Sequence, residues 1–396
     1  MINRFDKIID RKNTNSVKWD SCKRVFGSDD VLPMWVADSD WTAPQVVLNA
    51  LEERINHGIF GYTEPGDELN QVVVDWVKKR YGWETSPEWL VYISGVVPAV
   101  NVAVKSFAQS KSAAEQRSGV IVQPPVYYPF FSAVKNNGAK VIENQLIYKG
   151  DQYNIDFNDL EKKLAVADLI ILCSPHNPTG RVWNLEELER IGELCLKYDV
   201  RIVSDEIHSD LVYSGHKHIP IASLSNDLAR NTITMIAPSK AFNLAGLHAA
   251  VTIIPDAGLK RSFVKTMDGF VTAGNIMGYT AMRAAYSKGE EWLEEQMKYL
   301  GENRDYTMEY VDEYIPGIEA IKPEGTYLIW LDCRGLGLDN KELEDFMVKV
   351  AKVGLDVGTW FGSGGEGFMR LNLACPRSIL EEGLKRIRKA VENLEV

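Results

Sequence analysis

The sequence predicts an α/β protein, with a mainly parallel sheet in an α/β/α sandwich and a smaller α+β domain. From about residue 115 to 255, short apolar and β-branched runs alternate with helix-like segments. Near-continuous apolar strands of this kind are typical of a parallel sheet that is covered on both faces. The last hundred residues have a different pattern, in which long amphipathic helices surround a few separate strands.

The strands of the large domain follow one another in chain order. They are expected in "SGVIVQPPVYY", "KVIENQLIY", "DLIILCSPHNPTG", "VRIVSDEIHSD", "TITMIAPSK" and "HAAVTIIP". Between two of them, "NLEELERIGELCLKYD" has its apolar residues at helical spacing behind an Asn184 cap. Ligands of such sheets bind outside the carboxyl ends of the strands, so the residues at those ends matter most.

The C-terminal part begins with "EEWLEEQMKYLGENRDYTMEYVDEYI", which predicts a long helix. It continues through "GTYLIWLDC", the helical "KELEDFMVKVAKVG", "FMRLNLACP" and a final helix rich in charged residues. We expect an N-terminal segment over 1–50 that packs with the small domain, a large domain over 51–288 and the small domain over 289–396. No Pro/Gly/Ser-rich linker separates them, so the parts should be tightly joined.

Composition excludes several classes of function. The net charge of −11, without long like-charge runs, argues against a nucleic-acid or anionic-membrane partner. No apolar stretch approaches the roughly 20 residues of a membrane helix, and the charged start is no signal peptide. Five cysteines without a close pair indicate reduced thiols and a cytoplasmic protein. His216 and His218 stand close together, but no third ligand is evident and no metal is expected.

Two residues at strand ends carry charges in apolar surroundings. Lys240 follows "TMIAPS", and a desolvated lysine has a lowered pKa and becomes a nucleophile that can form a Schiff base. A lysine whose head reaches water is the alternative. Asp205 ends the strand "VRIVSD", where a buried carboxylate needs a cationic or hydrogen-bonding partner. A protonated ring nitrogen would supply one.

Three further signals lie at neighbouring strand ends. After Gly95 a helix begins, and the amides of Val96 and Val97 would point at a bound anion. Tyr127 in "PPVYYPF" offers an aromatic face for a flat ring, although a tyrosine in a turn against the core explains it equally well. Asn177 precedes a proline in "SPHNPTG", a turn in which its side-chain amide can donate outward.

Together these features describe a pocket for a phosphorylated, aromatic, aldehyde-bearing pyridine. An anion site, a stacking face, an amide donor, a buried carboxylate and an amine are the groups that pyridoxal 5′-phosphate (PLP) requires. Asp205 would keep the pyridine nitrogen protonated, so that the ring takes up electrons.

The ordered motifs "GVVPA", "PPVYYPF", "SPHNPTG", "SDEIHSDL" and "APSKAFNLAGL" resemble the fold-type I PLP enzymes of the class I/II aminotransferase superfamily. More narrowly, "NSVKWD", "LPMWVADSDW", "GIFGYT", "GVVPA" and "DEIHSDL" are similar to the MalY/PatB type of cystathionine β-lyase, or cysteine C–S lyase. The resemblance covers essentially the whole chain. It implies cleavage of cystathionine or other cysteine S-conjugates to a thiol, pyruvate and ammonia.

The resemblance also implies a role for each matching residue. Lys240 would carry the cofactor and move the Cα proton of the substrate. For the cofactor, the resemblance implies phosphate binding by Ser239, Val96 and Val97, ring stacking by Tyr127, donation to the 3-hydroxyl oxygen by Asn177 and a further contact by His208. Tyr62 would contact the phosphate bound by the partner subunit. The implied substrate-binding residues are Arg370, Tyr62, Asn177 and Ala37. Arg370 would clamp the substrate α-carboxylate, and the role of Tyr62 makes the active unit a homodimer.

Three positions depart from the commoner aminotransferase pattern. His248 stands where many relatives have a phosphate-binding arginine, and Ala237 stands where a second phosphate-binding serine is frequent. His208 replaces a tyrosine near the ring hydroxyl, and a purely structural histidine is the alternative. The resemblance leaves two other functions open: a PLP-dependent aminotransferase, and a PLP-binding regulator that contacts a protein partner.

Overall fold

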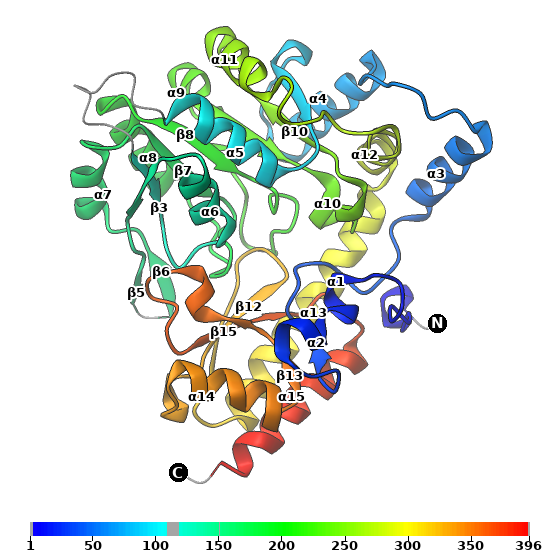
Figure 1. Cartoon of the computed structure of the whole chain (residues 1–396), viewed down its shortest axis with the longest axis vertical. Coiled ribbons are helices and arrows are strands. Elements are labelled where there is room, and N and C mark those ends of the chain that lie inside the picture. Colours follow the sequence, from blue (N-terminus) through cyan, green and yellow to red (C-terminus); the bar gives the residue numbers. More distant parts are fainter. Residues whose placement is uncertain (1–2, 109–118, 150, 395–396) are drawn as a thin grey trace.

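The computed structural model describes residues 3–108, 119–149 and 151–394 (Figure 1). A seven-stranded sheet in the order β2-β10-β9-β8-β7-β3-β4 forms its centre. Its strands are β2 (Leu90–Ile93), β3 (Gly119–Val122), β4 (Lys140–Glu143), β7 (Leu169–Cys173), β8 (Arg201–Asp205), β9 (Thr232–Ile236) and β10 (Ala250–Ile253). Only β10 runs against its neighbours within this sheet, so the prediction of a mainly parallel α/β sheet is confirmed. Residue 118, the start of the first predicted strand, lies outside the described residues.

Helices cover both faces of this sheet, because successive strand residues point to opposite sides. Ile171 and Val203 pack in one apolar cluster with α5, α6 and α11, whereas Ile170 and Ile202 pack in another with α7, α8 and α9 (Figure 1). These helices are α5 (Val96–Phe107), α6 (Pro129–Asn136), α7 (Phe157–Leu164), α8 (Leu185–Lys197), α9 (Asn226–Asn231) and α11 (Ala257–Met267). Helix α8 begins at the predicted Asn184 cap, whose side chain accepts a hydrogen bond from the amide of Glu187.

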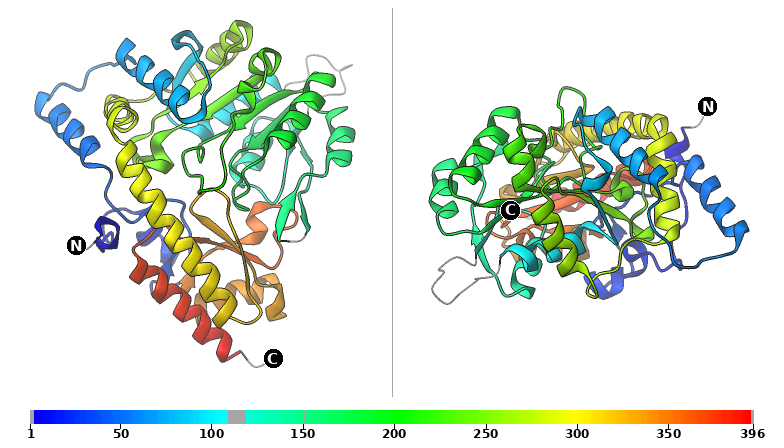
Figure 2. Two further views of the ribbon diagram at one scale, coloured as in Figure 1. Left: turned by 180° about the vertical axis from the view of Figure 1, so that it is seen from behind. Right: turned by 90° about the horizontal axis from the view of Figure 1, so that it is seen from above.

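A second, antiparallel sheet in the order β11-β12-β15-β14 lies below the first (Figure 1). Its elements and the helices around it are β11 (Glu319–Ile321), β12 (Leu328–Asp332), β14 (Asp356–Val357), β15 (Phe368–Asn372), α13 (Glu290–Tyr314), α14 (Asn340–Asp345) and α15 (Arg377–Glu392). The long helix α13 descends from the large sheet and runs beside α15 (Figure 2). The helix expected over 341–354 is shorter than predicted: α14 passes into a π-helical turn at Phe346–Val350, and the chain then enters β13 (Val353–Gly354).

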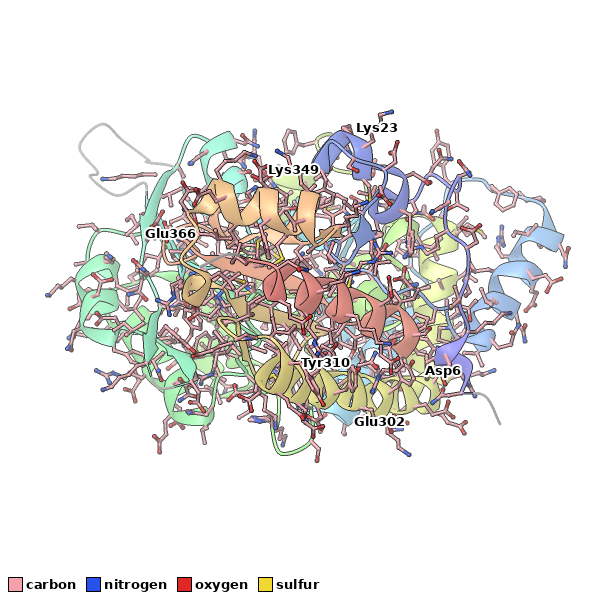
Figure 3. The ribbon with its side chains drawn as sticks, turned by 90° about the horizontal axis from the view of Figure 1, so that it is seen from below. Asp6, Lys23, Glu302, Tyr310, Lys349 and Glu366 are labelled. Carbon is pink, nitrogen blue, oxygen red and sulfur yellow. The ribbon has the colours of Figure 1, made fainter. Side chains whose placement is uncertain are left out.

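The N-terminal segment joins the C-terminal part through β1 (Leu32–Pro33), which pairs in parallel with β13 as a separate two-stranded sheet, and the carbonyl of Met34 accepts a hydrogen bond from the amide of Asn372 in β15. Its short helices α1 (Val17–Asp20) and α2 (Cys22–Phe26) lie on the same side of the molecule as α14 (Figure 3). The remaining elements are α3 (Gln45–His57), α4 (Asp67–Tyr81), α10 (Pro238–Ala241), α12 (Ile276–Lys288) and the hairpin β5 (Ile147–Lys149) with β6 (Gln152–Asn154). Helix α3 projects from the body of the molecule beside α12 (Figure 1).

None of the helices in the described residues has the length and apolarity that crossing a bilayer requires. All five cysteines are buried and carry free thiols.

Candidate functional site

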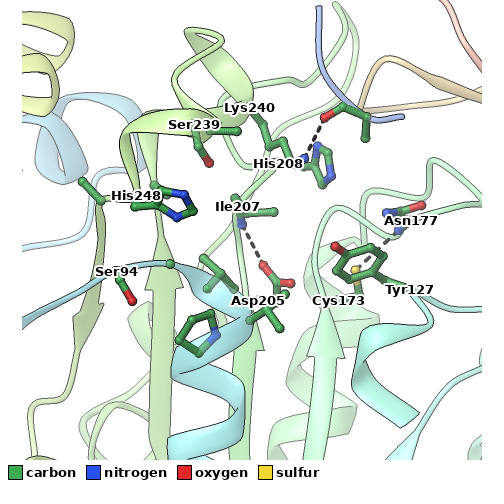
Figure 4. Close-up of a pocket in the computed structure, with 18 residues that line it drawn as sticks. Ser94, Tyr127, Cys173, Asn177, Asp205, Ile207, His208, Ser239, Lys240 and His248 are labelled. Carbon is green, nitrogen blue, oxygen red and sulfur yellow. Dashed lines mark hydrogen bonds between the residues drawn. The ribbon is translucent and has the colours of Figure 1, made fainter. Parts of the chain in front are cut away.

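A cavity of about 390 Å³ lies where the parallel strands β7, β8 and β9 end and helix α5 begins. Its position is the one expected for a ligand site of a parallel sheet, and its size suits a small molecule. Nine of the residues that the sequence predicts for the site line it: Ala37, Val96, Val97, Tyr127, Asn177, Asp205, His208, Ser239 and Lys240. They come from separate parts of the chain, and Figure 4 shows the labelled side chains around one space.

Lys240 reaches the cavity from α10, the short helix that follows β9. Its Nζ donates to the carbonyl oxygen of Ala37 at 2.7 Å (Figure 4). Burial, helped by the positive charge of Arg370, lowers the pKa of Lys240 to about 8, although Asp38 and Asp205 oppose this shift. About a tenth of the amine is therefore free at pH 7, far more than for an ordinary lysine, as a nucleophile or general base requires.

Asp205 is the last residue of β8, in register with Cys173 of β7 and Met235 of β9. The side chain is buried, and its Oδ1 accepts a hydrogen bond from the amide of Ile207 at 3.1 Å. Burial raises the pKa of Asp205 to about 7, despite the Ile207 amide and the charge of Lys240. Within the described part of the chain, no lysine, arginine or histidine forms an ion pair with this carboxylate.

An anion would find donors where helix α5 begins. Helix α5 begins after Gly95, and no side chain caps it, so the amides of Val96 and Val97 can donate to a ligand. Ser94, Ser239 and His248 line the same cavity (Figure 4). Two of the three predicted departures also line this cavity: Ala237 has a side chain that cannot donate, and His248 stands among the possible ligands.

Tyr127 and Asn177 lie together at one side of the cavity (Figure 4). The amide of Tyr127 donates to the carbonyl oxygen of Asn177 at 3.0 Å, which ties the two loops to each other. The amide of Asn177 in turn faces the thiol of Cys173 at 3.4 Å. Burial raises the pKa of Tyr127, so that the phenol stays neutral and its ring can serve as a stacking surface.

Arg370 is held at the edge of the site by the second sheet. It lies in β15, is 3% exposed and forms an ion pair with Asp356 of β14. Its Nη1 donates to Oδ1 of Asn177 at 3.0 Å, and its Nη2 donates to the carbonyl oxygen of Trp35 at 2.9 Å. A planar guanidinium in this position suits bidentate binding of a carboxylate.

His208 is buried beside Tyr327, with 6.0 Å between the ring centroids. Its Nδ1 has no hydrogen-bond partner among the described residues. Burial, together with the charges of Lys240 and Arg370, holds the pKa of His208 well below its ordinary value. The imidazole is therefore neutral at physiological pH and retains one ring nitrogen for a ligand.

Two predicted site residues do not line this cavity: Arg370, which lies at its edge and contacts Asn177, and Tyr62. Tyr62 lies on the segment between α3 and α4, and its side chain is fully exposed.

Sequence reasoning missed several residues around the site. Asp356 and Tyr327 were not expected, although Asp356 pairs with Arg370 and the Tyr327 hydroxyl donates to the carbonyl of Ala37 at 2.9 Å. Ser94 and Cys173 line the cavity as well. Ser94 and Cys173 precede recognised motifs directly, which is a usable signal, whereas Asp356 lies on a two-residue strand whose pairing no local pattern reveals.

The residues present fit the predicted PLP. A buried carboxylate without a cationic partner matches a protonated pyridine nitrogen, and an uncapped helix N-terminus matches a phosphate. An amine with a lowered pKa matches the aldehyde. The three groups line one cavity.

Comparison with known proteins gives concordant results. The sequence model of the family "Aminotransferase class I and II" matches residues 36–387. The chain is 46% identical to cystathionine beta-lyase PatB of Bacillus subtilis, over 98% of this chain and 99% of that protein. Cystalysin from Treponema denticola, a structure that contains PLP, superposes with a TM-score of 0.95 and 38% identity, over 100% of both chains. The PLP-bound C–S lyase from Staphylococcus hominis superposes with a TM-score of 0.90 and 36% identity, over 99% and 98% of the two chains.

Proposed function

Because the chain belongs to the class I and II aminotransferase family, we propose that it is a PLP-dependent carbon–sulfur β-lyase. Its substrates are cystathionine or other cysteine S-conjugates, which it converts to a thiol, pyruvate and ammonia. The observation that carries this proposal is the single cavity in which Lys240, Asp205 and the start of α5 meet. The similarity to cystathionine beta-lyase PatB over nearly the whole chain supports the choice of reaction.

Several lining residues have a task in holding the cofactor. The amides of Val96 and Val97, with Ser239, would hold the phosphate, and Tyr127 would offer its ring for stacking. Asn177 and the neutral His208 would bind the ring oxygen, and Asp205 would keep the pyridine nitrogen protonated. When bound, PLP supplies a conjugated cationic ring that accepts the electron pair released at the substrate Cα.

The chain's own groups move the proton and orient the substrate. Arg370 binds the α-carboxylate, and the carbonyl of Ala37 lies beside the amine of Lys240. Lys240 takes the Cα proton as a general base, since its pKa of about 8 leaves part of the amine free near neutral pH. The electron pair then forms a Cα–Cβ double bond while the Cβ–S bond breaks with its own pair on sulfur, and the departing thiolate takes a proton from the Lys240 ammonium or from water. Water converts the remaining unsaturated amine to pyruvate and ammonia.

We propose that the active unit is a homodimer. Apolar side chains are exposed along α3 and the segment after it: Ile55, Ile59, Phe60 and Tyr62 have exposed fractions of 56%, 64%, 57% and 113%. An exposed cluster of large apolar side chains marks a protein interface. A second copy of the chain would cover this cluster and place Tyr62 at the phosphate of the partner subunit.

We also propose a cytoplasmic location, which the five free, buried thiols support. A regulatory protein partner stays an untested prediction, and a pull-down from cell extract with the purified protein as bait would test it.

The decisive experiment mixes the PLP-loaded protein with L-cystathionine in the absence of a keto acid and follows free thiol and pyruvate together. Equal and continuing release of both establishes β-elimination. Absence of thiol, with amino transfer once a keto acid is added, would identify an aminotransferase instead. Lys240→Ala serves as the control and should release neither product.

A further inference from the structure

Residues 35–41, which we call the strap, cross the edge of the site without regular secondary structure. Side chains hold nearly all of its carbonyl groups. The donors are Arg370 to Trp35, Asn372 to Val36 and Asp38, Lys240 and Tyr327 to Ala37, Arg11 and Asn243 to Ser39, and Asn243 to Trp41. A backbone without ladder partners is thus fixed at almost every residue, as a precise position of its carbonyl groups requires.

The strap is also held by a cluster of four charges, of which Lys18 and Asp40 are buried and Arg11 and Asp38 are partly buried. Lys18 is fully buried, and its Nζ lies 2.6 Å from Oδ2 of Asp40. Arg11 joins both acids of the strap, with 2.7 Å from Nη1 to Oδ1 of Asp40 and 2.7 Å from Nη2 to Oδ2 of Asp38. The indole of Trp19 donates to Asp40 at 3.0 Å. Two cations and two anions therefore compensate each other within the protein.

Stability alone does not explain such a cluster. The desolvation of a buried ion pair offsets much of its attraction, so that apolar residues of similar volume stabilise a protein at least as well. A charge cluster also fixes the relative positions of its groups, because charge-assisted hydrogen bonds are strong and have a defined geometry. Here that geometry fixes Asp38 and Asp40, and Ala37, the residue before them, accepts the hydrogen bond of Lys240.

We propose that Lys18 and Arg11 are positioning residues for Lys240, which act by holding the strap so that the carbonyl of Ala37 faces the lysine amine. The inference rests on the proposed function, since Lys240 is the reacting group there. Neither positioning residue lines the cavity.

The amine of Lys240 should register any movement of the strap. The charged groups that act on it are Asp38, Asp205 and Arg370, and His208 lies in the same cavity. The Ala37 carbonyl and the negative charge of Asp38 both favour the ammonium form, whereas Arg370 and burial favour the free amine. A displaced strap withdraws the first two contributions, and the amine then loses its proton at a lower pH.

The test measures how fast Lys240 is labelled by trinitrobenzenesulfonate in the full-length protein freed of PLP, between pH 6 and 10, with peptide mapping of the site. In Lys18→Met we expect the pH at which Lys240 is labelled at half its maximal rate to fall by about half a unit. The labelling rate of Lys240 at pH 7 should then rise about threefold. The control is Lys163→Met, which removes a lysine–aspartate pair of the same 2.6 Å length in α7, far from the strap. In this control, Lys240 should be labelled with the same midpoint pH and rate as in the wild type.

A folded Lys18→Met protein whose Lys240 labels with the wild-type midpoint would overturn the proposal. If Lys18→Met does not fold, Arg11→Gln replaces it in the test, because this change removes the contacts of Arg11 with Asp38 and leaves the Lys18–Asp40 pair intact. An unchanged labelling midpoint of Lys240 in Arg11→Gln would also overturn the proposal. The labelling needs no substrate. A failure of the lyase assignment, seen as absent thiol release, is thereby distinguished from a failure of this inference.

Discussion

Nη1 of Arg370 lies 3.0 Å from Oδ1 of Asn177 and donates a hydrogen bond to it. This contact joins β15 of the antiparallel sheet to the loop after β7 of the large sheet. Since the amide oxygen of Asn177 is occupied by the guanidinium, its amide nitrogen is the group that it can offer to the cofactor. Substrate binding at Arg370 and cofactor binding at Asn177 are therefore coupled through one hydrogen bond.

We expect Asn177→Asp to raise the KM for cystathionine by about tenfold or more. The new carboxylate would pair with Arg370 and compete with the substrate α-carboxylate for the same guanidinium. Steady-state kinetics with saturating PLP measure this effect. Asn137→Asp, at the end of α6, introduces the same charge away from the site and should leave the KM unchanged. A wild-type KM in Asn177→Asp would show that Arg370 does not bind the substrate carboxylate.

Asp205 makes the cofactor-free protein sensitive to pH. Its pKa is about 7 in the folded protein, above the roughly 3.9 of an unfolded chain. The folded state therefore holds a proton that the unfolded state releases, and stability falls as the pH rises from about 4 to 7. Over this window the loss has an upper limit of about 4 kcal/mol.

Urea unfolding at pH 5 and pH 7.5 checks this prediction when wild type and Asp205→Asn are compared. Asp356, whose pKa burial raises to about 6 against the charge of Arg370, contributes a slope of the same sign in both proteins. The difference between the two slopes therefore isolates Asp205. Equal slopes would mean that Asp205 is ionised in the folded, cofactor-free protein.

Local sequence patterns predicted the elements that carry the chemistry, because each of these signals lies within a few residues. The apolar strand before Asp205, the glycine before α5 and the asparagine cap of α8 are such signals, and all three elements form where expected. Residues that depend on distant pairing were not predicted. Asp356 meets Arg370 only because β14 and β15 are neighbours, and Lys18 meets Asp40 only through the path of an irregular segment.

The cavity itself could be anticipated, since the ends of parallel strands meet at one edge of a sheet. The hydrogen bonds that hold the strap could not be anticipated. Ala37 was expected near the substrate from the resemblance alone, and nothing in "MWVADSDW" indicates that side chains from four parts of the chain hold its carbonyl groups. Hydrogen bonds between side chains and a non-repetitive backbone leave no periodic signal in a sequence.

Lys240 should reduce the stability of the cofactor-free protein. Its folded pKa of about 8 lies below the roughly 10.4 of an unfolded lysine, so at pH 7 the folded state retains a disfavoured charge. We expect Lys240→Met to abolish turnover and to raise the free energy of unfolding by about 2 kcal/mol at pH 7, after subtraction of the lost bond to Ala37. Between about pH 8 and 10 the unfolded wild type binds more protons than the folded wild type, so the free energy of unfolding of the wild type rises with pH. The difference in free energy of unfolding between Lys240→Met and the wild type therefore becomes smaller. A difference that stays constant over this range, measured by urea unfolding, would contradict the assigned pKa.

Mixed dimers test whether each site uses residues of two chains. As pure proteins, Tyr62→Ala and Lys240→Ala should each have strongly reduced activity, because every site lacks the Tyr62 side chain in the first and the Lys240 amine in the second. When they are mixed and the subunits exchange, half of the dimers are hybrids, and each hybrid contains one site with an intact Lys240 and an intact Tyr62. Recovered activity should therefore approach about one quarter of wild type. The same experiment with Lys240→Ala and Asp205→Ala is the control: both changes fall in sites built by one chain, each hybrid site lacks one of the two groups, and no activity returns. If the Tyr62→Ala mixture also stays inactive after verified subunit exchange, Tyr62 serves its own chain, and the proposed shared site is wrong.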